Sequence, residues 1–173
     1  MHDRARTANL LGAAALAVAD LVTDDTTRAA GVSASGAAAL VVLSASPGLS
    51  VTELGRRVGL SQPAAARMVD SLQAADLVNR RPGPGREVSV QPTSAGRHAA
   101  SLLLTARGEP LGELVSVLDE GEQDTLADLL AKLLTRLYTR VGSSELLCRL
   151  CDRASCTASA PCPVGKAERE QGR

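Results

Sequence analysis

The sequence contains no tryptophan, no phenylalanine and a single tyrosine among its 173 residues. Proteins that bind RNA or single-stranded DNA stack bases on aromatic side chains, so this mode of binding is excluded. An excess of one charge is also absent, because 19 Lys and Arg balance 19 Asp and Glu. The whole molecule therefore cannot coat nucleic acid non-specifically, and binding to duplex DNA must depend on local basic side chains.

Histidine is nearly absent, and the two that occur, His2 and His98, are far apart in the sequence. No Ser/His/Asp grouping and no glycine-rich loop that could cradle a phosphate accompanies them. We therefore expect a protein that is not an enzyme.

No apolar run reaches the roughly 20 residues, free of charge, that a membrane-spanning helix needs. The apolar stretch that follows Arg4 and Arg6 resembles a signal peptide, but Asp20, Asp24 and Asp25 interrupt it and its pattern continues as a longer helix. We expect one compact, soluble unit in the cytoplasm, with no membrane partner.

Residues 50–92 contain the most informative pattern in the sequence. A short apolar-periodic helix ends at Gly59, and a second helix begins at Ser61 with Pro63 in its first turn. Alternating apolar residues then flank a Gly/Pro stretch with the sequence RRPGPGRE, as in a β-hairpin. This order predicts a helix-turn-helix with an appended wing.

Helices are predicted on both sides of this region. Residues 5–30 and 33–46 show helical spacing before it, and a helix from Thr93 or Ser94, broken or kinked around Gly108 and Pro110, follows it. Glu122 lies three residues after Asp119, as in a capping box. The helix after that box has a wide apolar stripe, formed by Leu126, Leu129, Leu130, Leu133, Leu134 and Leu137. The stripe predicts packing against a second chain, although a helix that covers its own domain is the alternative.

The predicted fold class is mainly α with a small β-hairpin. Residues 1–35 form an N-terminal dimerisation helix, 36–98 the winged helix-turn-helix, 99–142 the C-terminal dimerisation helices and 143–173 a cysteine-rich tail. The charged end of this tail is expected to be disordered.

The segment SQPAAARMVDSLQAADLVNR, followed by GREVSVQPTSAGR, resembles the MarR family of winged-helix transcription regulators. The typical run of that family is Ser-x-Pro, small residues, Arg-hydrophobic-Val-Asp-x-Leu and Leu-Val-x-Arg before a wing. The resemblance extends from about residue 5 to 142. It implies a homodimer that binds duplex DNA and, as in many members, releases it in response to a small-molecule effector, an oxidant or a metal.

The predicted DNA contacts follow from the geometry of a helix in the major groove. Gln62 is the amide able to pair bidentately with adenine, and Arg67 can reach guanine or a phosphate. The other predicted positions are hydroxyls at helix starts, the first turn of the recognition helix, alanines facing thymine methyls and wing arginines: Ser50, Thr52, Ser61, Pro63, Ala65, Ala66, Arg80 and Arg86.

Each of these contacts has a simpler structural alternative. Arg56, Arg57, Arg80 and Arg81 can instead be surface charges that pair with Glu53, Asp76 or Glu87. Ser61 can be an N-cap, which is compatible with a phosphate contact.

All four cysteines lie close together near the end of the chain, as Cys148, Cys151, Cys156 and Cys162, and Pro163 follows the last. Four thiolates in a short segment suit a structural zinc ion, and a Cys-Pro pair at the last ligand also occurs with iron–sulfur clusters. Redox-sensing thiols and unpartnered cysteines are the alternatives, and a stable disulfide is not expected in the cytoplasm.

Together these features predict a dimeric transcription regulator, a repressor in our interpretation, that binds a pseudo-palindromic duplex site. Metal or thiol state at the cysteines would modulate it. The alternative is a winged helix that serves as a protein-interaction module without sequence-specific DNA binding.

Overall fold

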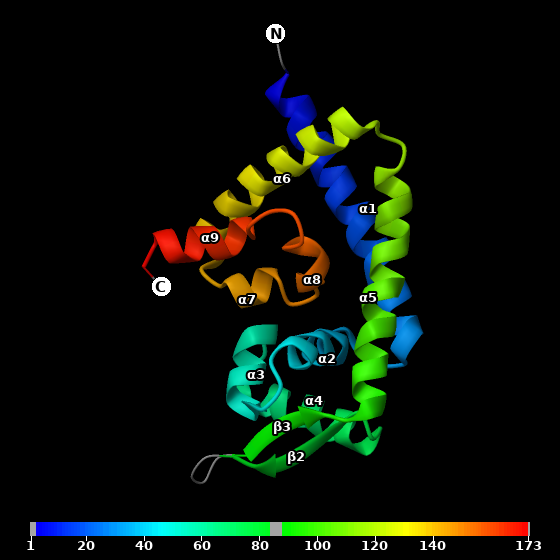
Figure 1. Cartoon of the computed structure of the whole chain (residues 1–173), viewed down its shortest axis with the longest axis vertical. Helices are drawn as coiled ribbons and strands as arrows, with labels where there is room; N and C mark the ends of the chain where they lie inside the picture. The colour runs from blue at the N-terminus through cyan, green and yellow to red at the C-terminus, as the bar shows by residue number, and fades with distance from the viewer. Residues whose placement is uncertain (1–2, 84–87, 173) are drawn as a thin grey trace.

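The structure of the chain, a computed structural model, describes residues 3–83 and 88–172, with the backbone alone for residues 23–30. Its elements are α1 (Arg4–Ala30), α2 (Ala34–Ala45), β1 (Leu49–Ser50), α3 (Val51–Val58), α4 (Gln62–Ala74), β2 (Val78–Pro82), β3 (Val88–Pro92), α5 (Ser94–Val115), α6 (Glu120–Val141), α7 (Ser144–Leu147), α8 (Arg153–Cys156) and α9 (Pro163–Glu170). A reading head of α2, α3, α4 and the sheet lies at one end of the molecule, and the long helices extend from it (Figure 1). The fold is mainly α with a small antiparallel sheet, as the sequence predicts.

The core of the reading head forms around α2. Residues 37–41 and Leu43 of this helix are buried, because apolar side chains occupy nearly all of its positions. The helix packs against α3, α4 and α5, and Leu54, Val69, Leu72 and Leu103 complete the core. This single core fixes the orientation of the two helices of the helix-turn-helix.

The sheet has three strands in the order β1-β3-β2, all antiparallel. The predicted hairpin is β2 with β3, in which Arg80 lies opposite Val90. Strand β1 pairs Leu49 with Val90 and was not predicted, because two residues are too short to show an alternating pattern. It ties the start of α3 to the wing.

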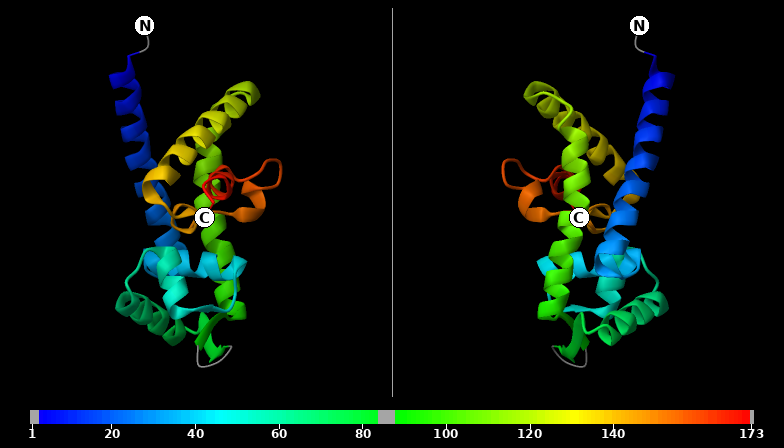
Figure 2. Two further views of the ribbon diagram at one scale, coloured as in Figure 1. Left: turned by 90° about the vertical axis from the view of Figure 1, so that its left-hand side faces the viewer. Right: turned by 90° about the vertical axis from the view of Figure 1, so that its right-hand side faces the viewer.

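Helices α1 and α5 lie side by side, and α6 turns back from the end of α5 at an angle to both (Figure 2). A break or kink was predicted near Gly108 and Pro110. The break is wrong, because α5 runs without interruption from Ser94 to Val115, and the kink stays a prediction. Proline removes one backbone hydrogen bond, but α5, which packs along α1, continues past Pro110. The predicted capping box of Asp119 and Glu122 is confirmed at the start of α6.

The outer faces of these helices are apolar and exposed. The exposed large apolar residues on them are Leu10, Leu11, Leu16 and Leu21 of α1, Leu102 and Leu114 of α5, and Leu129, Leu130, Leu133, Leu137 and Val141 of α6. Residues 4–22 are long and apolar enough to cross a membrane by length and composition, with a mean hydropathy of 1.3, and none of that window is buried. Apolar surface of this extent marks an interaction site.

The C-terminal segment folds back between α6 and the reading head (Figure 1). The prediction of a disordered charged end is wrong, since residues 163–170 form α9. Val164 and Ala167 bury the inner face of α9 against Tyr138 of α6, in a second small core. The sequence of α9 is polar overall, and two apolar residues are too few to predict a buried helix face.

Candidate DNA-reading surface and cysteine site

The turn between α3 and α4 brings these helices very close. Gly59 ends α3 in the left-handed conformation, with φ 75°. A Cβ added at Gly55 would lie 2.6 Å from the Cβ of Ala65, so glycine at residue 55 lets α4 pack directly on the backbone of α3. The side of α4 opposite this contact faces outward.

Ala65 therefore cannot contact DNA. Its side chain is fully buried, and the prediction that it lies against a thymine methyl is wrong. The sequence has three consecutive alanines at residues 64–66. Because they have the same size and polarity, the sequence does not show which of them faces α3.

The outward side of α4 presents the other predicted residues of this helix. Gln62, Pro63 and Arg67 are exposed, and Ala66 is half-buried. Arg67 has no ion-pair partner among the residues that the structure describes. A polar amide and, five residues later, a guanidinium without an ion pair are the kinds of group that read bases and phosphates in a major groove.

The hydroxyls at the helix starts differ in their roles. Ser50 caps α3 by accepting a hydrogen bond from the backbone N–H of Glu53 at 3.2 Å, and Thr52 is exposed beside it. Ser61 occupies the N-cap position of α4, but its side chain accepts no capping hydrogen bond. The Ser61 hydroxyl and the first N–H groups of α4 are thus open to an anion such as a phosphate.

Arg80 has an internal role. Its guanidinium donates to Asp70 Oδ1 at 2.6 Å and to Gln73 Oε1 at 2.7 Å. These bonds tie β2 to α4, so the structure favours the ion-pair alternative for Arg80, with a different acidic partner from those suggested. Arg86 and the rest of the wing tip, residues 84–87, lie outside the described residues.

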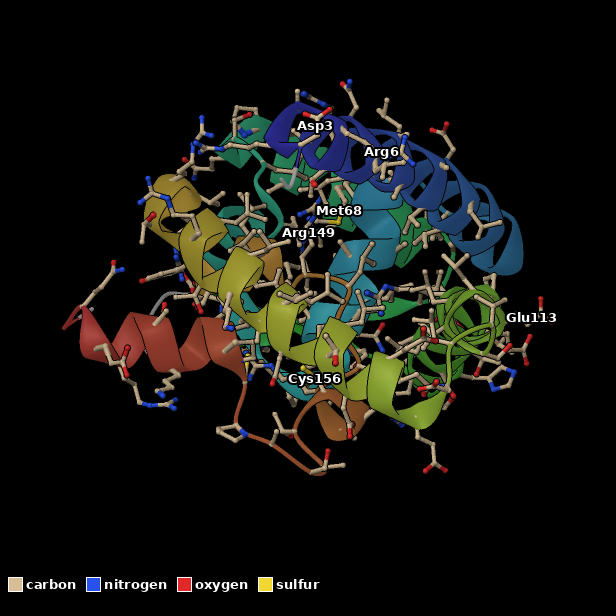
Figure 3. All side chains as sticks on the ribbon, turned by 90° about the horizontal axis from the view of Figure 1, so that it is seen from above. Asp3, Arg6, Met68, Glu113, Arg149 and Cys156 are labelled. Carbon is tan, nitrogen blue, oxygen red and sulfur yellow. The ribbon has the colours of Figure 1, made fainter. Side chains whose placement is uncertain are left out.

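The four cysteines come from three short elements of the C-terminal segment. Cys148 follows α7, Cys151 lies in the next turn, Cys156 ends α8 (Figure 3) and Cys162 is the N-cap of α9, where its sulfur accepts the N–H of Gly165 at 3.4 Å. A cavity of about 390 Å³ is lined by all four. The fold thus brings together side chains spread over 15 residues.

The thiols alter one another's pKa. The pKa of Cys148 is lowered because the thiol of Cys151 hydrogen-bonds to it, and the pKa of Cys151 is raised by the same bond and by burial. Burial, followed by the nearby charge of Cys151, raises the pKa of Cys156 to about 11. Of these three thiols, Cys148 is the one whose pKa is lowered, which favours the thiolate form that metal ligands and nucleophiles use.

Two further features lie around these thiols. The hydroxyl of Tyr138 is buried and has no hydrogen-bond partner among the described residues, and Cys148 and Cys162 pack against the same small core. Arg107, Arg153 and Arg169 line the cavities next to the cysteines. In the described part of the chain, no group of three or more His, Cys, Asp or Glu side chains is arranged to hold a metal ion.

Comparison with known proteins identifies the reading head. The sequence model of the MarR family matches residues 30–87. This part of the chain matches the MarR family. No curated protein matches it, whereas solved structures of the family match most of its length.

A MarR-family regulator from Silicibacter pomeroyi is 26% identical, with a TM-score of 0.55, 69% of this chain covered and 84% of that one. MepR, a regulator of the multidrug efflux pump MepA of Staphylococcus aureus, is 18% identical, with a TM-score of 0.67 and coverage of 75% and 97%. The MarR-family protein Rv2887 of Mycobacterium tuberculosis, in complex with salicylic acid, is 25% identical, with a TM-score of 0.53 and coverage of 71% and 95%. The fold of the chain is that of DNA-binding transcription regulators.

The four cysteines lie outside the residues that the MarR-family model matches. Two residues that the sequence did not single out connect them to the rest of the molecule. Tyr138, the one aromatic residue of the chain, anchors α9, and Glu145 of α7 contacts α3. Tyr138 could have been noticed because it is the one tyrosine of the sequence, whereas nothing in the sequence distinguishes Glu145 from other glutamates.

Proposed function

We propose that the chain is a homodimeric repressor that binds a pseudo-palindromic duplex DNA site through α4. The observation that supports this best is the outward side of α4, where Gln62 and Arg67 are exposed. Ser61 at the N-cap makes no side-chain capping hydrogen bond, so its hydroxyl can also contact a groove. Basic residues of the wing and the N–H groups at the start of α4 supply the phosphate contacts. Half-sites one helical turn apart would match the two-fold symmetry of the dimer.

The test is selection of bound duplexes from a random pool, followed by a gel shift at increasing salt. We expect a palindromic consensus and an affinity that falls steeply as salt rises, because bound cations are released from the phosphates. If no duplex is enriched and no salt-dependent shift occurs, the alternative function, a winged-helix module that binds a protein partner, replaces this one. Placing the selected site over a reporter promoter then distinguishes repression from activation.

Dimerisation is supported by the exposed leucines of α1, α5 and α6. A second copy that covers them would remove from water the apolar surface that a monomer exposes. Burial in a dimer interface would explain why residues 4–22 are apolar, so no membrane is needed to cover them. We therefore infer a cytoplasmic protein.

A small-molecule effector is a further part of the proposal. Its support is the relative from Mycobacterium tuberculosis that was solved with salicylic acid. Addition of salicylate to the gel shift tests it, with release of the duplex as the expected result.

The cysteine site is proposed to hold zinc, with an iron–sulfur cluster as the alternative. Cys148, Cys151, Cys156 and Cys162 would be the ligands, and zinc would stabilise the fold of a segment that has little apolar core of its own. The support is the all-thiol donor set and the nearby arginines, which offset the negative charge of four thiolates. The described thiols are not arranged as a metal site, so zinc would have to draw them together.

Metal content and an absorption spectrum, measured on protein purified without oxygen, test this site. About one zinc per chain and no visible absorption supports the zinc site. Iron with visible absorption supports the cluster, and the absence of both metals contradicts the site.

A further inference from the structure

Helix α7 follows the long helix α6 after a tight turn of two residues, Gly142 and Ser143. Gly142 ends α6 in the left-handed conformation, with φ 69°, and its N–H donates to the carbonyl of Tyr138 at 2.8 Å. Ser143 is the N-cap of α7, and its hydroxyl accepts a hydrogen bond from the backbone N–H of Leu146 at 3.2 Å. Because hydrogen bonds fix both residues of the turn, α7 keeps a set orientation relative to α6.

Two side-chain contacts also hold α7 to the C-terminal helices. Ser144, which is buried, donates to Glu168 Oε1 of α9 at 2.7 Å. Leu147 packs against the small core around Tyr138 that joins α9 to α6. Helix α7 is therefore a rigid extension of α6.

The side chain of Glu145 connects α7 to α3 of the reading head. Its carboxylate accepts hydrogen bonds from Nη2 and Nη1 of Arg56 at 3.0 and 3.4 Å, and lies 3.9 Å from Arg57. Glu53 of α3 binds the same two arginines at 2.7 Å. Two acids and two arginines thus form one network, which holds its members more firmly than an isolated surface pair does.

An apolar contact adds to these ion pairs. Leu146 Cδ1 lies 2.9 Å from the position that a Cβ on Gly59 would take, so its side chain rests on the turn that connects α3 and α4. The space left between α2, α3 and the segment that begins with α7 is a cavity of about 30 Å³, which has room for about two waters. A tilt of α3 relative to α7 would disrupt this close packing.

The contact of α7 with α3 lies away from the covalent links of the reading head. The chain enters the head from α1 and leaves it through α5, and these two helices lie side by side. Figure 1 shows α1 and α5 on one side of the head and the contact of α7 with α3 on the other. Two adjacent links allow the head to tilt about them, and a third contact on the opposite side restrains that tilt.

We propose that Glu145 is a positioning residue, which holds the two reading heads of the dimer at a set distance and so determines the half-site spacing that the protein accepts. This inference rests on the proposed homodimer and on DNA binding through α4. Helix α6 belongs to the proposed dimer face, so a head fixed to α6 through α7 is fixed relative to its copy. One base pair more or less between half-sites displaces them by about 3.4 Å and rotates them by about 34°. A loosened head can follow this change, and a restrained head cannot.

The experiment compares the full-length parent with Glu145→Gln, which keeps the size of the side chain and removes its charge. The matched control is Glu170→Gln, because Glu170 is an exposed glutamate of α9 whose ion pair, with Lys166 at 3.9 Å, does not involve α3. A second variant, Arg56→Gln, removes the same contact from the side of α3.

Each protein is titrated with duplexes that carry the selected half-sites at the selected spacing and at spacings one base pair shorter and longer. The ratio of affinities at the selected and altered spacings is the spacing preference. A variant that is merely less stable loses affinity for every duplex by the same factor, so this ratio reports on the position of the heads. Amide hydrogen exchange of residues 51–58 is measured without DNA.

We expect the parent and Glu170→Gln to prefer the selected spacing about tenfold or more, because an altered spacing must be met by deforming the duplex. In Glu145→Gln and Arg56→Gln this preference should fall about threefold or more, as expected for the loss of a partly exposed ion-pair network. The half-site sequence should stay the same, because α4 itself is unaltered. Exchange of residues 51–58 should be faster in both variants than in the parent.

Several outcomes overturn the inference. An unchanged spacing preference in Glu145→Gln or in Arg56→Gln refutes it while DNA binding stands, and so does a parent that binds all spacings equally. A loss of affinity of equal size at every spacing would give Glu145 a role in general stability alone. A parent that binds no duplex, or binds as a monomer, refutes the proposed function first and this inference with it.

Discussion

At the scale of single residues, Gly55 and Ala65 show how closely the reading head is packed. A methyl group at residue 55 would lie 2.6 Å from the Cβ of Ala65, which is fully buried. Neither residue contacts DNA, but their approach determines where α4 lies on α3. Their small size is therefore a requirement of the fold that supports the DNA-reading surface.

Gly55→Ala should lower the free energy of unfolding by about 1 to 3 kcal/mol, because the added methyl forces α3 and α4 apart. Gly112→Ala is the matched control, since nothing lies within 4 Å of its new Cβ and alanine favours a helix. Urea denaturation measures both. Equal effects of the two substitutions would show that α3 and α4 are not in close contact.

Gln62→Ala should weaken binding to the selected duplex about tenfold, since a bidentate amide–adenine pair contributes about 1 to 3 kcal/mol. Gln171→Ala, at the exposed end of α9, serves as the control and should bind like the parent. A titration of labelled duplex gives both affinities. If Gln62→Ala binds the duplex as tightly as the parent, base recognition depends on other side chains.

Tyr138→Phe should leave the stability of the metal-free protein unchanged or slightly higher, because the buried hydroxyl has no hydrogen-bond partner among the described residues. Tyr138→Ala should cost about 3 to 5 kcal/mol, since it empties the small core under α9. Thermal unfolding of both variants checks this. A clear destabilisation by Tyr138→Phe would reveal a hydrogen bond to this hydroxyl.

At the scale of elements, α3 and α7 are held together by charge. The hydrogen bond from Arg56 lowers the pKa of Glu53 from 4.5 to about 2, against the opposing effect of burial and with further help from Arg57. The pKa of Glu145 is also lowered, since hydrogen bonding and charge from Arg56 and charge from Arg57 outweigh its burial. Both acids are thus more acidic in the folded state than in the unfolded chain.

A lowered carboxyl pKa stabilises the fold above the pKa of the unfolded chain, and that stabilisation is lost as the pH falls toward the folded value. The parent should therefore lose stability between about pH 4.5 and pH 2. Because water screens the partly exposed side chains, we expect Glu53 to contribute about 1 kcal/mol. Glu53→Gln should flatten this part of a curve of unfolding free energy against pH. An identical slope in the variant would contradict the role of Glu53.

At the scale of the whole molecule, the outer faces of α1, α5 and α6 remain without cover in a single chain (Figure 2). Leu133 and Leu137 are 41% and 45% exposed on the face of α6, one turn apart. Apolar side chains at this spacing are the expected pattern of a helix that packs on another chain. The proposed dimer would bring two reading heads onto one DNA site.

The double variant Leu133→Gln and Leu137→Gln should shift the dimer toward monomer, because both side chains then lose apolar contact with the second copy. The control substitution Lys132→Gln, on the same helix, should leave the molecular mass of the dimer in solution unchanged. Sedimentation equilibrium measures the two. A dimer that persists at the same concentration in the double variant would place the interface elsewhere.

The sequence by itself determined the long helices, the helix-turn-helix and the hairpin, in their order along the chain. Gly59, Ser61 and Pro63 have strong local preferences, and Asp119 with Glu122 forms a cap within four residues, so each was predictable without tertiary contacts. The exposed members of the predicted DNA surface on α4, among them Gln62 and Arg67, also followed from their place in the first two turns of a helix.

Only the tertiary structure decided which of these residues are available. It buries Ala65 against Gly55, pairs Arg80 with Asp70, and brings Glu145 to Arg56. Such contacts join residues from different elements, and no local pattern encodes them. Tertiary contacts also determine that the C-terminal segment is folded. Helix α9 is stabilised by packing against Tyr138, and its own short sequence would not hold it helical.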